Sequence, residues 1–264
     1  MEITVPDTPT EPGEASSGVA VLDRAFSLLG AFGPTDERLT LTELSKRTGL
    51  YKSTVLRLLA ALEHGGFIRK LEDGQYAVGP QPMRLAAIYQ RSFRVDSIVE
   101  PLLGELSRKL GETASFYVRA GARRLVVSRV EPARSVRVSI RVGEDFEVEK
   151  GASGKVLLAF TEPESGSVHT LVRTRLWATS YGERDPETAS ASVPVFGAVG
   201  DLKGALTVSG PRARLGEPET MLAAVAALLA MAQRATAEFG GNPGRFTASR
   251  ESLRLELLGP SATT

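Results

Sequence analysis

The sequence contains no cysteine and only two histidines in 264 residues. Without cysteine, the chain cannot form disulfides, iron–sulfur clusters or thiolate zinc sites, and it has no cysteine nucleophile. His64 and His169 alone do not make a histidine-rich zinc site. We therefore predict no metal, no cofactor and no catalytic residues, and the lack of cysteine fits a reducing, cytoplasmic compartment.

Long apolar runs are also missing from the sequence. No uninterrupted stretch of about 18 apolar residues occurs, so we predict that no segment spans a membrane. Residues 1–17 carry four acidic residues and three prolines but no lysine or arginine. A secretory signal needs a basic start and an apolar centre, and this segment has neither. We expect residues 1–17 to be a disordered tail of a cytoplasmic protein.

The overall charge is nearly balanced, with 32 lysines and arginines against 31 aspartates and glutamates. Net charge therefore indicates no class of partner, and only the local distribution of charge is informative. Hydrophobic residues make up 42% of the chain, which is ordinary for a globular protein. A chain of 264 residues is long enough for two domains, each with its own core.

The first part of the chain has the order helix, short helix, tight turn, helix, hairpin. Thr40 and Glu43 form the Thr-x-x-Glu pattern of a capping box, which predicts where the short helix begins. Asp73-Gly74 between two β-like runs is a strong signal for a tight hairpin. This order is typical of a winged helix-turn-helix. The segments are residues 19–32, 40–49 and 52–64 for the helices, and 67–71 and 75–78 for the strands.

Basic residues concentrate in this region. Residues 45–70 hold six basic residues and one acidic residue. In the third helix, Val55, Leu58 and Leu59 recur at core spacing, which leaves the polar residues of the first turns facing outward. The alternative is a solvated basic helix in a protein–protein domain, but the order of elements favours DNA. The predicted DNA-binding residues are Lys46, Tyr51, Lys52, Ser53, Thr54, Arg57, Arg69 and Lys70.

The pattern changes to alternating apolar and polar residues beyond Glu112, as expected for half-buried strands. We predict strands over residues 113–119, 124–130, 135–142, 190–196 and 204–209, and helices over residues 96–110, 152–160 and 217–238. Residues 240–264 are rich in Gly, Pro, Ser and Arg, and we expect them to be disordered. The predicted domains are a winged helix-turn-helix (18–82), a linker helix (83–95), an effector-binding domain (96–239) and a disordered tail (240–264).

Short motifs in both halves resemble the IclR family of bacterial transcriptional regulators. The resemblance rests on Val21-Leu22-Asp23-Arg24-Ala25, Leu41-Thr42-Glu43-Leu44, Thr48-Gly49-Leu50, Lys52-Ser53-Thr54-Val55, Gly111-Glu112-Thr113, Ala152-Ser153-Gly154-Lys155 and Leu206-Thr207-Val208-Ser209-Gly210-Pro211. Relatives commonly have proline at the position of Tyr51 and histidine at that of Leu56. Both positions lie near the predicted DNA face, so no operator sequence is carried over from the family.

The resemblance implies an α+β protein, in which a helical linker joins the winged helix-turn-helix to an α/β effector-binding domain with a GAF-like antiparallel sheet. It also implies a DNA-binding regulator that works as a homodimer or tetramer under the control of a small-molecule effector. Dimer symmetry predicts a palindromic operator. Two alternatives remain, namely a constitutive DNA-binding protein without a ligand and an enzyme that carries a DNA-binding appendage.

The predicted effector site begins at Gly151, Ala152 and Ser153, which open a helix. Small residues let a ligand approach the backbone, and the unpaired N–H groups of a helix start attract anions such as an organic acid. The resemblance adds Ser180 and Ser190 as polar groups of the same pocket. Some relatives have an acidic residue and a cysteine there, so the pocket is expected to be less acidic. The simpler interpretation is that residues 151–153 only cap a helix.

Overall fold

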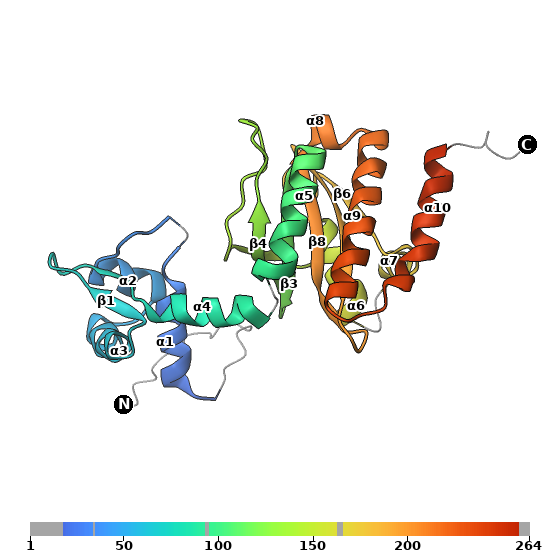
Figure 1. Ribbon diagram of the computed structural model, residues 1–264. Helices are drawn as coiled ribbons and strands as arrows, with labels where there is room; N and C mark the ends of the chain where they lie inside the picture. The colour runs from blue at the N-terminus through green and yellow to red at the C-terminus, as the bar shows by residue number, and fades with distance from the viewer. Residues whose placement is uncertain (1–17, 34, 93–94, 163–165, 259–264) are drawn as a thin grey trace, which may run out of the picture. The chain divides into compact units, whose positions relative to one another are not determined.

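The structure is a computed structural model that describes residues 18–33, 35–92, 95–162 and 166–258 (Figure 1). The chain divides into two compact units, Met1–Ala87 and Ile88–Thr264. The boundary falls inside α4 (Gln81–Ser92), at the place where a linker helix was predicted. The tail expected over residues 1–17 lies outside the described residues, as does the end of the chain from residue 259.

The first unit has the predicted order of three helices and a hairpin. The Thr40 side chain accepts a hydrogen bond from the Glu43 N–H, and the Glu43 carboxylate accepts one from the Thr40 N–H at 2.8 Å, so the capping box is confirmed. Gly49, with φ of +70°, ends the second helix in a conformation that favours glycine. The elements are α1 (Ala20–Gly30), α2 (Leu41–Thr48), α3 (Lys52–His64), β1 (Ile68–Lys70) and β2 (Tyr76–Val78).

A small apolar core holds this unit together. One face of α3 lies inside it, which leaves the first turn of α3 on the surface. The Leu39 N–H donates to the Tyr76 carbonyl at 2.8 Å, so the segment before α2 is tied to the hairpin. The buried core residues are Leu28, Leu39, Leu44, Val55, Leu58, Leu59, Ile68 and Tyr76.

The second unit contains a six-stranded sheet in the order β5-β4-β3-β8-β7-β6. Every neighbouring pair is antiparallel. The predicted α+β class with an antiparallel sheet is therefore confirmed. The strands are β3 (Thr113–Ala120), β4 (Arg123–Val130), β5 (Asp145–Glu147), β6 (Ala178–Tyr181), β7 (Thr188–Phe196) and β8 (Leu202–Pro211).

Helices cover both faces of this sheet, as Figure 1 shows. On one face, α5 (Glu100–Leu110) and α9 (Pro218–Glu238) pack against residues such as Phe116. On the other face, α6 (Gly151–Thr161) and α7 (Ser167–Arg175) pack against residues such as Tyr117. Because successive side chains of a strand point to opposite faces, the adjacent residues 116 and 117 serve two separate cores.

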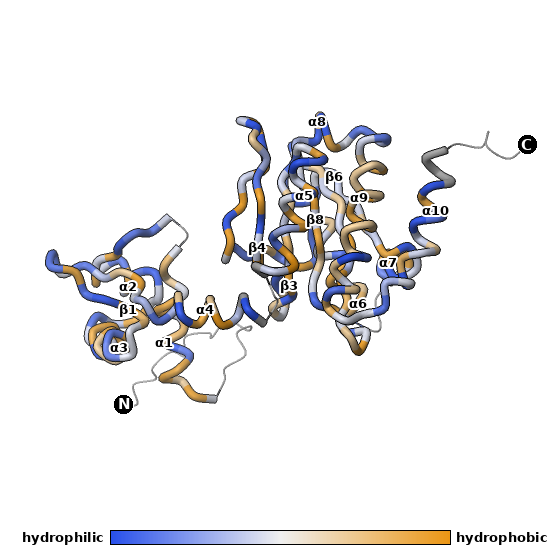
Figure 2. Tube along the Cα trace, viewed as in Figure 1, coloured by the Kyte–Doolittle hydropathy of each residue, from blue (hydrophilic) through white to orange (hydrophobic). Residues whose placement is uncertain are grey.

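The helix α9 is long and apolar enough to cross a membrane by length and composition alone. Its apolar character shows as an orange tube in Figure 2. However, 56% of its most apolar window is buried inside the fold, where it packs on β7 and β8. Burial against the sheet accounts for the composition of α9, which is a core helix of the second unit.

The strand expected over residues 135–142 is wrong. Val138 and Ile140 are buried while Val136 and Val142 are exposed, so only the middle of the apolar series faces inward. Residues 135–142 belong to no strand, and the strand that pairs with this edge of β4 is β5, opposite residues 123–125. Alternation in the sequence does not establish hydrogen bonding to a neighbouring strand.

The disordered tail expected over residues 240–264 is also wrong for the part that is described. A 3-10 helix, Pro243–Phe246, leads into α10 (Thr247–Leu258). The Asn242 side chain caps the first of these by accepting from the Gly244 N–H at 2.9 Å. Phe246 is fully buried and lies against Phe196, so packing outweighs the Gly- and Ser-rich composition. The helix α7 and the strand β6 were not predicted at all.

Candidate DNA-binding face and ligand cavity

The first turn of α3 presents polar side chains to solvent. Tyr51 directly precedes the helix and is 85% exposed, and Lys52, Ser53 and Arg57 are exposed as well. Thr54 is half-buried, so it faces outward less fully than predicted. Among the described residues, no side chain caps the N-terminus of α3. Its first N–H groups therefore remain available to an anion such as a DNA phosphate.

Five exposed Lys and Arg side chains on α2, α3 and β1 make no ion pair with any residue that the structure describes. Unpaired positive charge of this kind attracts a polyanion, because phosphate contacts release counterions from DNA. Arg47 is different, since it pairs with Asp36 and donates to the Ala31 carbonyl at 2.8 Å. The five unpaired residues are Lys46 on α2, Lys52 and Arg57 on α3, and Arg69 and Lys70 on β1.

The hairpin holds Arg69 and Lys70 in fixed positions, opposite Ala77 and Tyr76. The Lys70 N–H also donates to Glu63 Oε1 of α3 at 3.3 Å, which links the hairpin to the helix. Arg69 shares a shallow surface hollow with acidic side chains, whereas Lys70 does not line that hollow. The acidic residues of the hollow are Glu37, Glu72 and Asp73.

A small polar cavity lies between the start of α6 and the sheet of the second unit. All five residues predicted for the effector site line it, although they come from three different elements. The cavity measures about 30 Å³. The structure thus brings together Gly151, Ala152, Ser153, Ser180 and Ser190.

Hydroxyl groups form the sheet side of this cavity. Ser180 of β6 is paired with Ser190 of β7, which is in turn paired with Ser209 of β8. Thr207, two residues before Ser209, lines the cavity too and shares a 2.8 Å hydrogen bond with the buried Ser192. Three adjacent strands therefore present hydroxyls to one place. The sequence analysis found Ser180 and Ser190 but missed the two residues of β8.

Arg124 is the cavity residue of greatest chemical consequence that sequence analysis missed. It lies on β4 and is only 4% exposed. Its Nη1 donates to the Lys150 carbonyl, and its guanidinium carbon lies 5.6 Å from the ring centres of both Tyr117 and Phe146. Burial lowers the pKa of Arg124 below its ordinary value. No pattern in the sequence distinguishes Arg124 from its neighbour Arg123.

The start of α6 is already occupied by an anion of the chain itself. The Gly151 N–H donates to Glu183 Oε2 at 3.0 Å, and Lys155 forms an ion pair with the same carboxylate. Burial alone would raise the pKa of Glu183, but the hydrogen bonds from Lys155 and Gly151 outweigh it and leave that pKa lowered. The helix start is therefore less open to a ligand than the sequence suggested.

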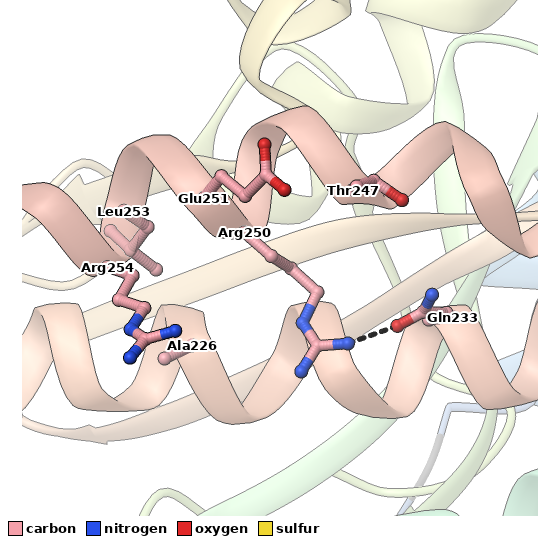
Figure 3. A pocket seen from close by; sticks show the side chains of 7 residues that line it. All are labelled: Ala226, Gln233, Thr247, Arg250, Glu251, Leu253 and Arg254. Atoms are coloured by element: carbon pink, nitrogen blue, oxygen red, sulfur yellow. Dashed lines mark hydrogen bonds between the residues drawn. The ribbon is translucent and has the colours of Figure 1, made fainter.

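A second hollow of about 400 Å³ lies between α9 and α10 and contains none of the predicted site residues. Figure 3 shows that Arg250 donates a hydrogen bond to the Gln233 side chain across it. Arg254 and Glu251 line the hollow as well, so it carries both positive and negative side chains. Among the described residues, no three His, Asp or Glu side chains gather as possible metal ligands.

A three-helix unit with a basic hairpin, followed by an antiparallel α/β domain with a polar cavity, defines a DNA-binding transcriptional regulator. The IclR helix-turn-helix domain matches residues 21–72. The C-terminal domain of the bacterial transcriptional regulator IclR matches residues 88–176 and 168–237. The chain belongs to the IclR family.

Several members of the family resemble this chain over much of its length. An HTH-type transcriptional regulator of Mycobacterium tuberculosis is 36% identical over 155 residues, which are 58% of this chain and 59% of that protein. The regulator BhcR of Paracoccus denitrificans is 28% identical over 229 residues, 77% of this chain and 82% of BhcR. These relatives are transcriptional regulators and not enzymes.

Solved structures agree with the assignment of the fold. An IclR transcriptional regulator from a Silicibacter species superposes with a TM-score of 0.73 at 28% identity, covering 86% of this chain and 99% of that one. An IclR homologue of Microbacterium hydrocarbonoxydans, solved in complex with 4-hydroxybenzoate, gives a TM-score of 0.67 at 20% identity, covering 83% and 98%. The second likeness concerns the fold alone.

Proposed function

We propose that this cytoplasmic regulator recognises its operator sequence with the exposed face of α3 and contacts the DNA backbone with the hairpin. The observation that carries the proposal is the set of five unpaired basic side chains on α2, α3 and β1. Arg57 and the residues of the first turn of α3 would contact base edges. Lys46, Arg69 and Lys70 would contact phosphates, which fix position but read no sequence.

We propose further that the DNA-bound form is a homodimer, or a tetramer built from dimers, on a palindromic operator. One helix-turn-helix covers few base pairs, and two-fold symmetry extends the contact. The helices α1 and α4 support this proposal because they expose large apolar side chains that a second copy would cover. These include Val21, Leu22 and Phe26 on α1 and Met83 and Leu85 on α4.

The cavity beneath α6 is the proposed effector site, and its proposed ligand is a small organic acid. The five predicted residues lie together there, with Arg124 and Arg184 as positive charges. The complex of the Microbacterium homologue with 4-hydroxybenzoate indicates that a protein of this fold takes a small carboxylic acid. Ligand control requires that the acid bind the DNA-competent and DNA-incompetent states with different affinities.

Fluorescence anisotropy with DNA upstream of the chain's own gene tests both halves of the proposal. We expect tight, salt-dependent binding that weakens greatly when either half-site of a palindrome is scrambled. A panel of small carboxylic acids should then shift the DNA affinity in one direction. Unchanged binding after scrambling would contradict the dimeric readout. DNA binding that no acid alters would instead favour the alternative, a constitutive DNA-binding protein.

A further inference from the structure

Arg124 is a buried cation without a counter-ion. Although it is only 4% exposed, it forms no ion pair with any carboxylate that the structure describes. The nearby carboxylates are engaged elsewhere: Asp145 pairs with Arg123, Glu147 with Lys150, and Glu183 with Lys155. Burying an uncompensated charge is costly, so such a group is usually paired when the protein works.

The hydrogen bonds of Arg124 are also incomplete. Its Nη1 donates to the Lys150 carbonyl, but its Nε has no hydrogen-bond partner within the described part of the chain. Guanidinium donors are arranged as a rigid fork that matches the two oxygens of a carboxylate. The stacking on Tyr117 and Phe146 holds the group in place without satisfying these donors. The guanidinium is therefore prepared for a planar anion.

The rest of the cavity indicates what such an anion carries. Six hydroxyl side chains line it, and they can donate and accept hydrogen bonds to hydroxyls of a guest. Apart from the Tyr117 ring, the apolar lining is limited to Ile140, Ala152 and Ala189. An aromatic ligand would need wider apolar walls. The six hydroxyl side chains are those of Ser153, Ser180, Thr188, Ser190, Thr207 and Ser209.

We propose that Arg124 binds the carboxylate of a small aliphatic hydroxy acid, and that the hydroxyl side chains of the cavity bind the hydroxyl groups of that acid. This inference rests on the proposed effector site and adds the chemical class of the ligand and its counter-ion. Glu183 favours this placement, because it already accepts the Gly151 N–H and leaves two arginines, Arg124 and the half-buried Arg184, as the positive side chains that line the cavity. Of the two, Arg124 is the buried one, and its Nε has no partner among the described residues.

The test uses the full-length protein and calorimetric titration with D-glycerate, L-lactate and L-malate. The neutral amides glyceramide and lactamide are matched controls, and 4-hydroxybenzoate represents aromatic acids. We expect at least one hydroxy acid to bind about 10- to 100-fold more tightly than its amide, the range for a charge-assisted hydrogen bond. Comparable binding of acid and amide, or binding of none of the three acids, would overturn the inference.

Variants then assign the effect to Arg124. Arg124→Met should abolish the preference for acid over amide, and Arg124→Lys should keep part of it because the charge remains. Arg123→Met is the matched control, since Arg123 is the neighbouring residue but is half-exposed and pairs with Asp145. If Arg124 were only a support for the Lys150 turn, Arg124→Met would lower the melting temperature and leave the preference intact.

Operator binding without any acid separates this inference from the proposed function. If 4-hydroxybenzoate binds and shifts DNA affinity while the hydroxy acids do not bind, the effector site stands and the ligand class is wrong. If Arg124→Met retains the acid preference, Arg124 is not the counter-ion. If no acid binds and DNA affinity never changes, ligand control itself fails together with this inference.

Discussion

A β-carbon on Gly154 would lie 1.9 Å from the carbonyl oxygen of Val148. The second turn of α6 therefore touches the backbone of the segment that leads into it. Contact this close requires glycine, because there is no space for a β-carbon at position 154. This contact holds the start of α6, which lines the cavity, against the segment that contains Val148.

Gly154→Ala should therefore destabilise the second unit by about 1–3 kcal/mol, as overpacking does, although alanine normally stabilises a helix. Gly104→Ala on α5 is the control, because a β-carbon there would meet only Arg108 Nη1 at 3.7 Å. That change should stabilise by up to about 1 kcal/mol. Urea unfolding measures the change in the free energy of unfolding of each variant, and the two changes should have opposite signs. Changes of the same sign would contradict the geometry at Gly154.

Arg57→Ala should lower the preference for the operator over random DNA by about one to two orders of magnitude while the fold stays intact. One good contact between a side chain and a base contributes about 1–3 kcal/mol of discrimination. Arg108→Ala, an exposed arginine on α5 of the other unit, is the control and should leave both affinities unchanged. A gel-shift titration against operator and scrambled DNA measures the ratio. A wild-type ratio in Arg57→Ala would show that Arg57 reads no base.

Lys70→Ala should weaken binding to all DNA sequences equally and lower the slope of log affinity against log salt by about one unit. Arg69→Ala should do less, because Arg69 shares its surface hollow with three acidic side chains. Anisotropy titrations at several salt concentrations give both slopes. An altered base preference at one operator position, with the slope unchanged, would contradict the assignment to phosphate.

Glu183→Gln should reduce stability at neutral pH and have no effect in acid. The pKa of Glu183 is lowered from 4.5, so its charge stabilises the fold fully above that pH, and this contribution is lost as the pH falls through the folded value. The side chain is 34% exposed, so we expect a loss of at most about 1 kcal/mol at pH 7. Denaturant unfolding of Glu183→Gln and of the control Glu187→Gln, an exposed residue of the same loop, should differ at pH 7 and converge as the pH falls below the folded-state pKa of Glu183.

The helix-turn-helix could be predicted from the sequence because its signals are local. The bounds of α3, Lys52–His64, follow from apolar spacing and from the glycines after it, and the hairpin follows from Asp73-Gly74. The cavity was predicted in part, since the residues around Gly151 share one short motif. Thr207 and Ser209 reach it through strand pairing, which no local pattern encodes.

Arg124 was missed for a related reason. In the sequence, Arg123 and Arg124 are equivalent basic residues at the start of a strand. Only the pairing of β4 with its neighbours determines that Arg123 faces solvent and Asp145 while Arg124 faces the cavity. Likewise, the 3-10 helix and α10 looked disordered by composition, and their buried side chains Phe246 and Leu253 are stabilised by contacts with distant parts of the chain.

The cavity beneath α6 is small, about 30 Å³, which has a consequence for dose and response. A ligand that needs more room than this binds only those conformers in which the cavity is wider. The concentration needed for half-saturation is then the intrinsic Kd divided by the fraction of open conformers. Substitutions that loosen α6 without touching the ligand would make the promoter respond to less of it. Sensitivity is therefore set by how tightly α6 packs, and selectivity is set by Arg124 and the hydroxyls.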